Sequence, residues 1–121
     1  MSIKFQGNVN LAVNQSTAAN FTSNPIIIDM INVMTFDIGW TGNFTGNFII
    51  EASNQDITVL NIATVVWKPL STLTVTAGVA TGGSTFWWAE ILTGARYLRL
   101  RYSFTSGTGN FNCLTFGKSY G

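Results

Sequence analysis

Apolar and polar residues alternate with a period of two wherever this chain shows a clear pattern. The clearest run is 96–104, where one face carries Leu98, Leu100, Tyr102 and Phe104. Successive side chains of a β-strand point to opposite faces, so this alternation is typical of a strand with one buried face. No window spaces its apolar residues by three and four, which argues against any substantial helix.

The remaining strands follow from the same alternation and from the turn residues between them. We expect strands over 3–13, 26–40, 48–53, 57–67, 73–75, 86–92 and 110–117. Their apolar faces are expected to point inward, among them Val9, Val13, Met34, Phe36, Ile38 and Trp40, whereas Asp37, Glu51 and Glu90 are expected to point outward. Segments rich in Gly, Asn and Ser separate them, among them the predicted turn Ser106-Gly107-Thr108-Gly109. About eight short strands of this kind predict an all-β fold, an antiparallel two-sheet β-sandwich of jelly-roll type. A closed β-barrel is the structural alternative.

Length and charge narrow the function classes. The 121 residues suit one domain, so we expect a single β-sandwich domain over 1–121. Charged residues make up only 9% of the chain and leave a net charge of +1, which argues against binding to nucleic acid. Asn, Ser, Thr and Gly interrupt the apolar runs, so we expect neither a membrane-spanning helix nor a secretion signal.

The residues most used in catalysis and metal binding are scarce. The chain has no histidine and one cysteine, so the usual zinc and haem ligands and the usual base for a Ser or Cys nucleophile are missing. We therefore expect no enzymatic activity, no cofactor and no metal. Calcium bound by Asp56 and nearby carbonyls is the alternative. Cys113 has apolar neighbours, and we expect it to be a small buried hydrophobe.

Two adjacent tryptophans must point to opposite faces of the strand predicted over 86–92. Ala89 shares the face of Trp87, so we expect Trp87 to lie in the core. Trp88 and Phe86 then form an exposed apolar patch, of the kind that marks a protein interface or a platform for sugar rings. The alternative is that the fold covers both faces, because tryptophan is usually buried.

The basic residues gather late in the chain. Arg99 and Arg101 project from one strand face about 7 Å apart, with Tyr97 on the same side. Four of the six basic residues lie at or after position 96, whereas all five acids precede it. This asymmetry favours docking between subunits or against an acidic partner. The alternative is pairing of both arginines with carboxylates of the fold itself, namely Glu51, Asp37 or Glu90.

The tetrapeptide Thr-Gly-Asn-Phe occurs three times, at 41–44, 45–48 and 108–111. Gly and Asn tolerate positive φ angles, so the simplest interpretation is a turn that precedes a core phenylalanine. The alternative is a repeated ligand-binding loop, which requires the repeats to meet in space.

The order of several landmarks resembles discoidin-type, galactose-binding-like β-sandwiches. The landmarks are Glu51-Ala52-Ser53-Asn54, then Trp67, then Ala95-Arg96-Tyr97-Leu98-Arg99-Leu100. The turn Asn54-Gln55-Asp56 and the lack of terminal cysteines depart from that family, and no ligand-binding loop can be carried over. This resemblance implies a carbohydrate-binding adhesion module.

The small uncharged chain with its late segment Arg-Tyr-Ser-Phe-Thr-Ser-Gly-Thr-Gly-Asn-Phe also resembles small virion proteins of tailed bacteriophages. This second resemblance implies a non-enzymatic capsid decoration (cement) protein, made in the host cytoplasm and located in the virion. Its expected partners are copies of itself, as a homotrimer, and the major capsid protein or another virion protein. The expected contact residues are Trp88, Phe86, Tyr97, Arg99 and Arg101. The carbohydrate-binding module is the alternative function.

Overall fold

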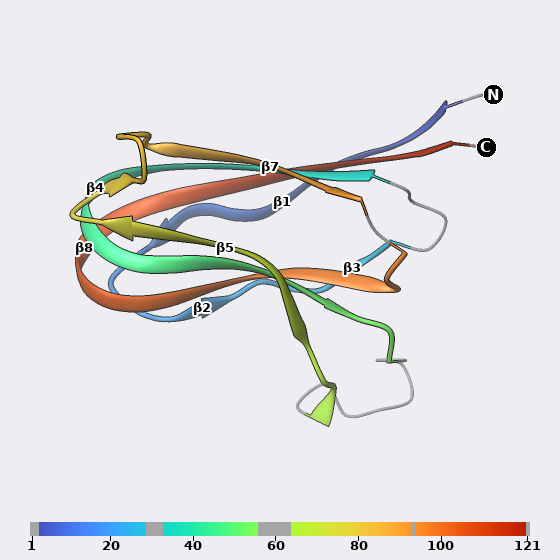
Figure 1. The fold of residues 1–121 in the computed structure, drawn as a ribbon, viewed down its shortest axis with the longest axis horizontal. Helices are drawn as coiled ribbons and strands as arrows, with labels where there is room; N and C mark the ends of the chain where they lie inside the picture. Colours follow the sequence, from blue (N-terminus) through green and yellow to red (C-terminus); the bar gives the residue numbers. More distant parts are fainter. Residues whose placement is uncertain (1–2, 29–32, 56–63, 93, 121) are drawn as a thin grey trace.

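Eight antiparallel strands form one hydrogen-bonded sheet, which curls so that its two halves face each other (Figure 1). The computed structural model describes residues 3–28, 33–55, 64–92 and 94–120. Its strands are β1 (Ile3–Ser16), β2 (Phe21–Thr22), β3 (Ile26–Ile27), β4 (Val33–Ser53), β5 (Lys68–Thr76), β6 (Val79–Ala80), β7 (Phe86–Leu92) and β8 (Tyr97–Tyr120). The prediction of an all-β antiparallel sandwich of about eight strands is confirmed. Within the described ranges, no helix is long and apolar enough to cross a membrane.

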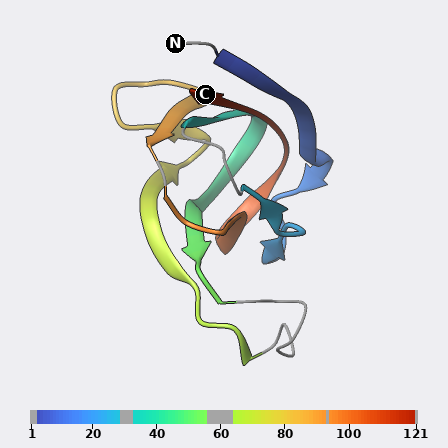
Figure 2. The ribbon, with the colours of Figure 1, turned by 90° about the vertical axis from the view of Figure 1, so that its right-hand side faces the viewer.

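The two longest strands, β4 and β8, build both layers. They pair along the whole of β4, from Val33 opposite Lys118 to Ser53 opposite Tyr97, and both bend near their middle (Figure 1). The upper layer of Figure 1 contains β7, residues 33–41 of β4, residues 110–120 of β8, and β1. The lower layer contains β5, residues 46–53 of β4, residues 97–104 of β8, and the short strands β2 and β3. Figure 2 shows the curled sheet from its open end.

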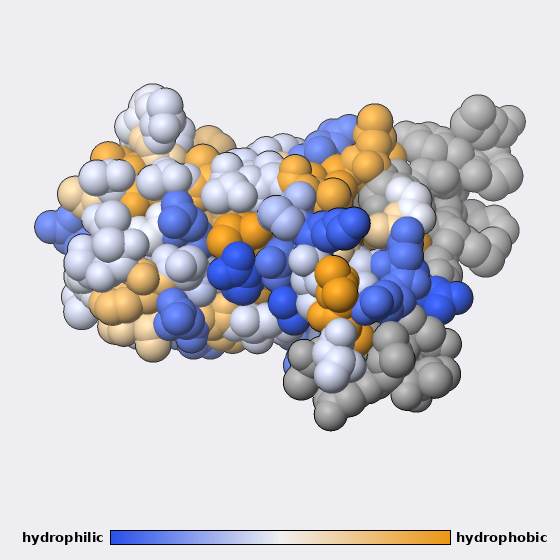
Figure 3. All heavy atoms as spheres, turned by 60° about the horizontal axis from the view of Figure 1, so that its bottom comes forward, coloured by the Kyte–Doolittle hydropathy of each residue, from blue (hydrophilic) through white to orange (hydrophobic). Residues whose placement is uncertain are grey.

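Glycines make the bend possible. Gly42 lies opposite Gly109 in the β4–β8 ladder, and Gly42 and Gly107 have φ angles of 102° and 83°. A Cβ atom on Gly109 would collide with the carbonyl oxygen of Thr41, and one on Gly42 would collide with the Gly109 backbone. The prediction of a turn over 106–109 is therefore wrong, because these residues continue β8 through a bend. The left end of the molecule in Figure 3, where this bend and the connection between β5 and β7 lie, is largely near-white.

The first and third Thr-Gly-Asn-Phe repeats meet in space, but as paired strands rather than loops. Asn43 lies opposite Thr108 in the ladder. The phenylalanines of the three repeats, Phe44, Phe48 and Phe111, are fully buried, and the rings of Phe48 and Phe111 lie 5.0 Å apart. The expectation of core phenylalanines is confirmed, whereas a strand bend takes the place of the expected turns.

The core lies between the layers. On β4 the predicted inward residues are all buried, namely Met34, Phe36, Ile38 and Trp40. Two buried polar groups are satisfied by the backbone: the Trp40 indole Nε1 donates to the Gly78 carbonyl at 2.9 Å, and the Tyr102 hydroxyl donates to the Thr17 carbonyl at 2.9 Å. These bonds tie the turn between β5 and β6 and the 17–20 loop to the core.

Several predicted positions are wrong, and irregular ladders explain most of them. Val9 and Val13 were expected to face inward, yet they are 45% and 66% exposed. β-Bulges in β1 on both sides of Ala12 shift the register there, so that Ala12 is buried and Val13 is not. Val9 precedes these bulges and lies opposite buried Thr115, but it is exposed on an edge strand. Phe104 is half-exposed beside a register shift at 45–46. β5 runs through Pro69, and residues 65–67 form no strand, whereas 57–63 lie outside the described residues.

Candidate binding surfaces

The two arginines of the predicted arginine face share one carboxylate within the molecule. Glu51 lies opposite Arg99 in the ladder, and its two carboxylate oxygens accept from Nε of Arg99 at 2.9 Å and Nε of Arg101 at 3.0 Å. The Arg99 guanidinium also lies 4.2 Å from the centroid of the Trp67 ring, a cation–π contact. Pairing of both arginines with Glu51, one of the two interpretations of the sequence, is confirmed.

Two residues of this arginine face are more buried than the alternation predicts. Glu51 was expected to point outward, but its side chain is only 6% exposed because two arginines lie against it. Tyr97 was expected to accompany the arginines as a contact residue, but it is 4% exposed. β8 is flanked there on both sides, with Ile27 of β3 opposite Tyr97 on one edge and Ser53 of β4 on the other. Tyr97 is therefore not available as a contact residue in this chain alone.

The structure places Trp88 and Phe86 on the surface of an edge strand. Within the described residues β7 pairs with β4 alone, and Trp88, Phe86 and Leu92 are 60%, 59% and 79% exposed. Trp87 packs against the core, as the alternation predicts. Trp88 therefore stands on the outer side of the upper layer, which faces away from the lower layer.

The ladder arranges the neighbours of Trp88 in rows. One row across β7, β4 and β8 holds Trp88, Asp37 and Leu114. The next row holds Glu90, Thr35 and Phe116. A hollow of about 350 Å³ opens among these two rows and extends to Asn8 of β1 and Lys118 of β8. We call the surface formed by these two rows, with Asn8 and Lys118, the upper outer face.

The carboxylates of the upper outer face are not neutralised like Glu51. Within the described residues, Asp37 and Glu90 form no ion pair and no side-chain hydrogen bond. The charge of Asp37 also acts on the buried Cys113. Burial is the larger cause and the Asp37 carboxylate the smaller one, and together they raise the pKa of the Cys113 thiol from 9.0 to about 12. Cys113 is fully buried, which confirms its predicted role as a core residue.

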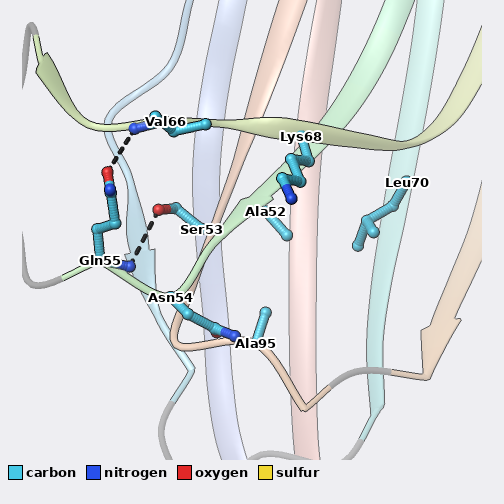
Figure 4. A pocket seen from close by; sticks show the side chains of 8 residues that line it. All are labelled: Ala52, Ser53, Asn54, Gln55, Val66, Lys68, Leu70 and Ala95. Atoms are coloured by element: carbon cyan, nitrogen blue, oxygen red, sulfur yellow. Dashed lines mark hydrogen bonds between the residues drawn. The ribbon is translucent and has the colours of Figure 1, made fainter.

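Another hollow, of about 500 Å³, lies between the end of β4 and the start of β5 (Figure 4). Its polar side chains bond to the local backbone. The Gln55 backbone N–H donates to Ser53 Oγ at 3.2 Å, and the Val66 backbone N–H donates to Gln55 Oε1. Lys68 is the one charged residue among its described lining. Asp56, the predicted calcium ligand, lies outside the described residues.

A third surface was missed by the sequence analysis. A groove of about 320 Å³ separates β1 from β3 and is lined by Val9, Leu11 and Ile27, with Asn10 and Asn24 beside them. Val9 and Ile27 are exposed in this groove, and Val13 is exposed farther along β1. We call the groove, with the exposed edge of β1 beside it, the β1 side. The alternation assigned Val9 and Val13 to the core, but the β-bulges beside Ala12 bring Val13 to the surface, and Val9 is exposed because β1 is an edge strand.

Two solved structures share the fold over almost the whole chain. The SPBc2 prophage-derived protein YomS superposes with a TM-score of 0.60 at 6% identity, covering 96% of each chain. The PBSX exported protein XepA superposes with a TM-score of 0.55 at 17% identity; the match covers 99% of this chain but 37% of XepA. Identities this low establish likeness of fold alone. No protein-family model and no curated protein sequence matches the chain.

Proposed function

We propose that the protein is a non-enzymatic structural component of a bacteriophage particle, most directly a capsid decoration protein that binds the shell as an oligomer. Two proteins of phage origin, YomS and XepA, have the same fold, which supports an association with phage. The lack of enzymatic activity belongs to the proposal because the chain has no histidine and its single thiol is buried.

The free edge of β1 is the observation that carries this proposal. Within the described residues β1 pairs with β8 alone, so the backbone N–H and C=O groups along its other edge can bond to another chain. Exposed Val9, Val13 and Ile27 adjoin this edge. No charged residue occurs between positions 5 and 28, although charges are the usual protection of a strand edge against association. The β1 side therefore combines apolar and hydrogen-bonding groups suited to contact with another protein.

Assembly through this side is tested with Val13→Lys. Val13 is 66% exposed, so the added charge is expected to leave folding intact while it opposes burial of the edge. We expect the wild-type protein to be oligomeric by native mass spectrometry, with a trimer as the specific expectation, and to sediment with phage particles. Val13→Lys should be monomeric and stay in the supernatant.

The matched control is Leu70→Lys, which places the same charge at an exposed position of β5 in the other layer. This variant should assemble like the wild type. A wild-type protein that is monomeric and never sediments with particles would overturn the proposal, and equal loss of assembly in both variants would refute the assignment to the β1 side.

A further inference from the structure

We propose that the upper outer face binds an oligosaccharide without negative charge, with the Trp88 indole as the stacking platform. This face lies on the outer surface of the upper layer and spans β7, β4 and β8, reaching β1 at Asn8, whereas the groove of the β1 side opens between β1 and β3. Binding around Trp88 and Asp37 therefore does not require the free edge of β1.

Trp88 has the exposure and the support that stacking requires. Its side chain is 60% exposed, while its neighbours Trp87 and Ala89 pack against the core and hold the strand in place. A sugar ring presents C–H groups on one face and hydroxyl groups at its rim. A planar indole can cover the C–H face without losing hydrogen bonds, and little entropy is lost because the strand is already ordered.

Hydrogen-bond acceptors lie at the right spacing from this platform. Asp37 is the direct ladder partner of Trp88, which places the two residues about 5 Å apart, and Glu90 follows two positions along β7, about 7 Å away. A hydroxyl at the rim of a stacked ring can therefore donate to either carboxylate. Among the described residues neither carboxylate has a partner, so both keep their acceptor capacity.

The charge of the hollow selects the class of sugar. Its lining carries Asp37 and Glu90 against Lys118, a net charge of −1. Uronic and sialic acids would add a further carboxylate next to these two and be repelled. Neutral and amino sugars are free of that repulsion. The volume of about 350 Å³ lies near the lower end of small-molecule sites, which span about 300–1,000 Å³.

A second hollow extends the site along β4. Gly39 occupies the next outward position after Asp37, and a Cβ atom there would meet nothing within 4 Å. The space of about 180 Å³ at this position is lined by the amides of Asn14, Asn110 and Asn112. Asn112 Oδ1 already accepts from the Asn14 backbone, which orients its NH₂ group. Neutral amides on one flank and carboxylates on the other suit a chain of several sugar units.

The test uses an array of neutral, amino and acidic oligosaccharides, followed by calorimetric titration of the strongest neutral or amino ligand. We expect Trp88→Ala to weaken binding at least 10-fold and Asp37→Asn to weaken it severalfold. Thermal melting should show that Trp88→Ala remains folded, because most of the replaced ring is exposed. Ile27→Lys, which adds a charge in the groove of the β1 side, should bind the same ligand as tightly as the wild type, because Ile27 lines neither hollow.

Three results would overturn the inference. The first is a wild-type protein that binds no neutral or amino oligosaccharide with a Kd below about 10 mM. The second is a folded Trp88→Ala variant that binds as tightly as the wild type. The third is a preference for acidic oligosaccharides. Loss of particle sedimentation in Trp88→Ala, together with the first result, would assign the face to a protein partner instead.

Discussion

The two halves of β8 carry similar alternating patterns, yet they end in different surroundings. On residues 97–104 both outward arginines have partners: Glu51 binds the two of them, and Trp67 lies against Arg99. On residues 110–120 the outward side chains Leu114 and Phe116 adjoin Asp37 and an exposed Trp88, and no counter-ion binds that carboxylate among the described residues. Alternation therefore determines to which face of the sheet a side chain points. The neighbouring strands determine whether a charged side chain on that face has a partner.

The largest effect is expected from a variant that disrupts the bend between the two halves. Gly109→Ala places a methyl group against the Thr41 carbonyl and the Gly42 backbone, neither of which can move without opening the β4–β8 ladder. We expect a loss of about 3 kcal/mol or more in the free energy of unfolding, the range of severe overpacking and backbone strain. Urea denaturation followed by circular dichroism measures this loss.

Gly39→Ala is the control for that variant, because its Cβ would meet no atom within 4 Å and Gly39 has no positive φ angle. Its stability should match or slightly exceed that of the wild type. If both glycine variants unfold at the same urea concentration, close packing of the bend is not what requires Gly109.

An intermediate effect is expected when a carboxylate is neutralised in each half. Glu51→Gln removes the charge that two guanidinium groups share, at a side chain that is 6% exposed. We expect a loss of about 2 kcal/mol, below the 3–5 kcal/mol of a fully buried pair because Arg101 is partly exposed. Asp37→Asn makes the same change where no counter-ion is bound, and should change stability by less than about 0.5 kcal/mol. Equal losses in the two variants would contradict the contrast between the halves.

The smallest effect is the pH dependence of stability that Cys113 adds in the second half. The raised pKa of Cys113 means that the unfolded chain loses its thiol proton near pH 9 while the folded protein keeps it to about pH 12. The stability contributed by the neutral buried thiol is therefore complete below pH 9 and falls as the pH rises, by at most about 1.4 kcal/mol per unit. Urea unfolding of the wild type and of Cys113→Ala is compared at pH 8.5 and 9.5 under reducing conditions. The difference between their pH dependences gives the contribution of Cys113 to the free energy of unfolding.

Burial also raises the pKa of Tyr102, so both proteins should lose stability above pH 10, and the comparison is best made below that value. Identical slopes for the wild type and Cys113→Ala would show that Cys113 does not carry the dependence.

Period-two alternation was sufficient for the features that depend on one strand. It identified the inward face of residues 34–40, the division between Trp87 and Trp88, and the burial of Cys113. It also left pairing of the arginines with Glu51 as one of two interpretations, and the ladder decides between them by placing Glu51 opposite Arg99.

The errors arose where the outcome depends on another strand. Gly and Asn permit a positive φ angle in a turn and in a strand bend alike, so residues 106–109 could not reveal that β8 continues. A β-bulge has no residue signature of its own, which is why Val13 was assigned to the core. Tyr97 was expected at the surface because its cover comes from β3 and β4, at distant positions in the sequence.

The connectivity of β4 and β8 also sets the order in which the chain can fold. Although they are ladder partners along the whole of β4, strands β5, β6 and β7 lie between them in the sequence. No short hairpin can nucleate this ladder, and folds dominated by such distant pairings form in roughly milliseconds to seconds, the slow end for small domains. Among the described residues β1 pairs with β8 alone, so β1 cannot join the sheet until residues 110–120 of β8 have been made. The edge of β1 that we propose for assembly therefore forms late in folding.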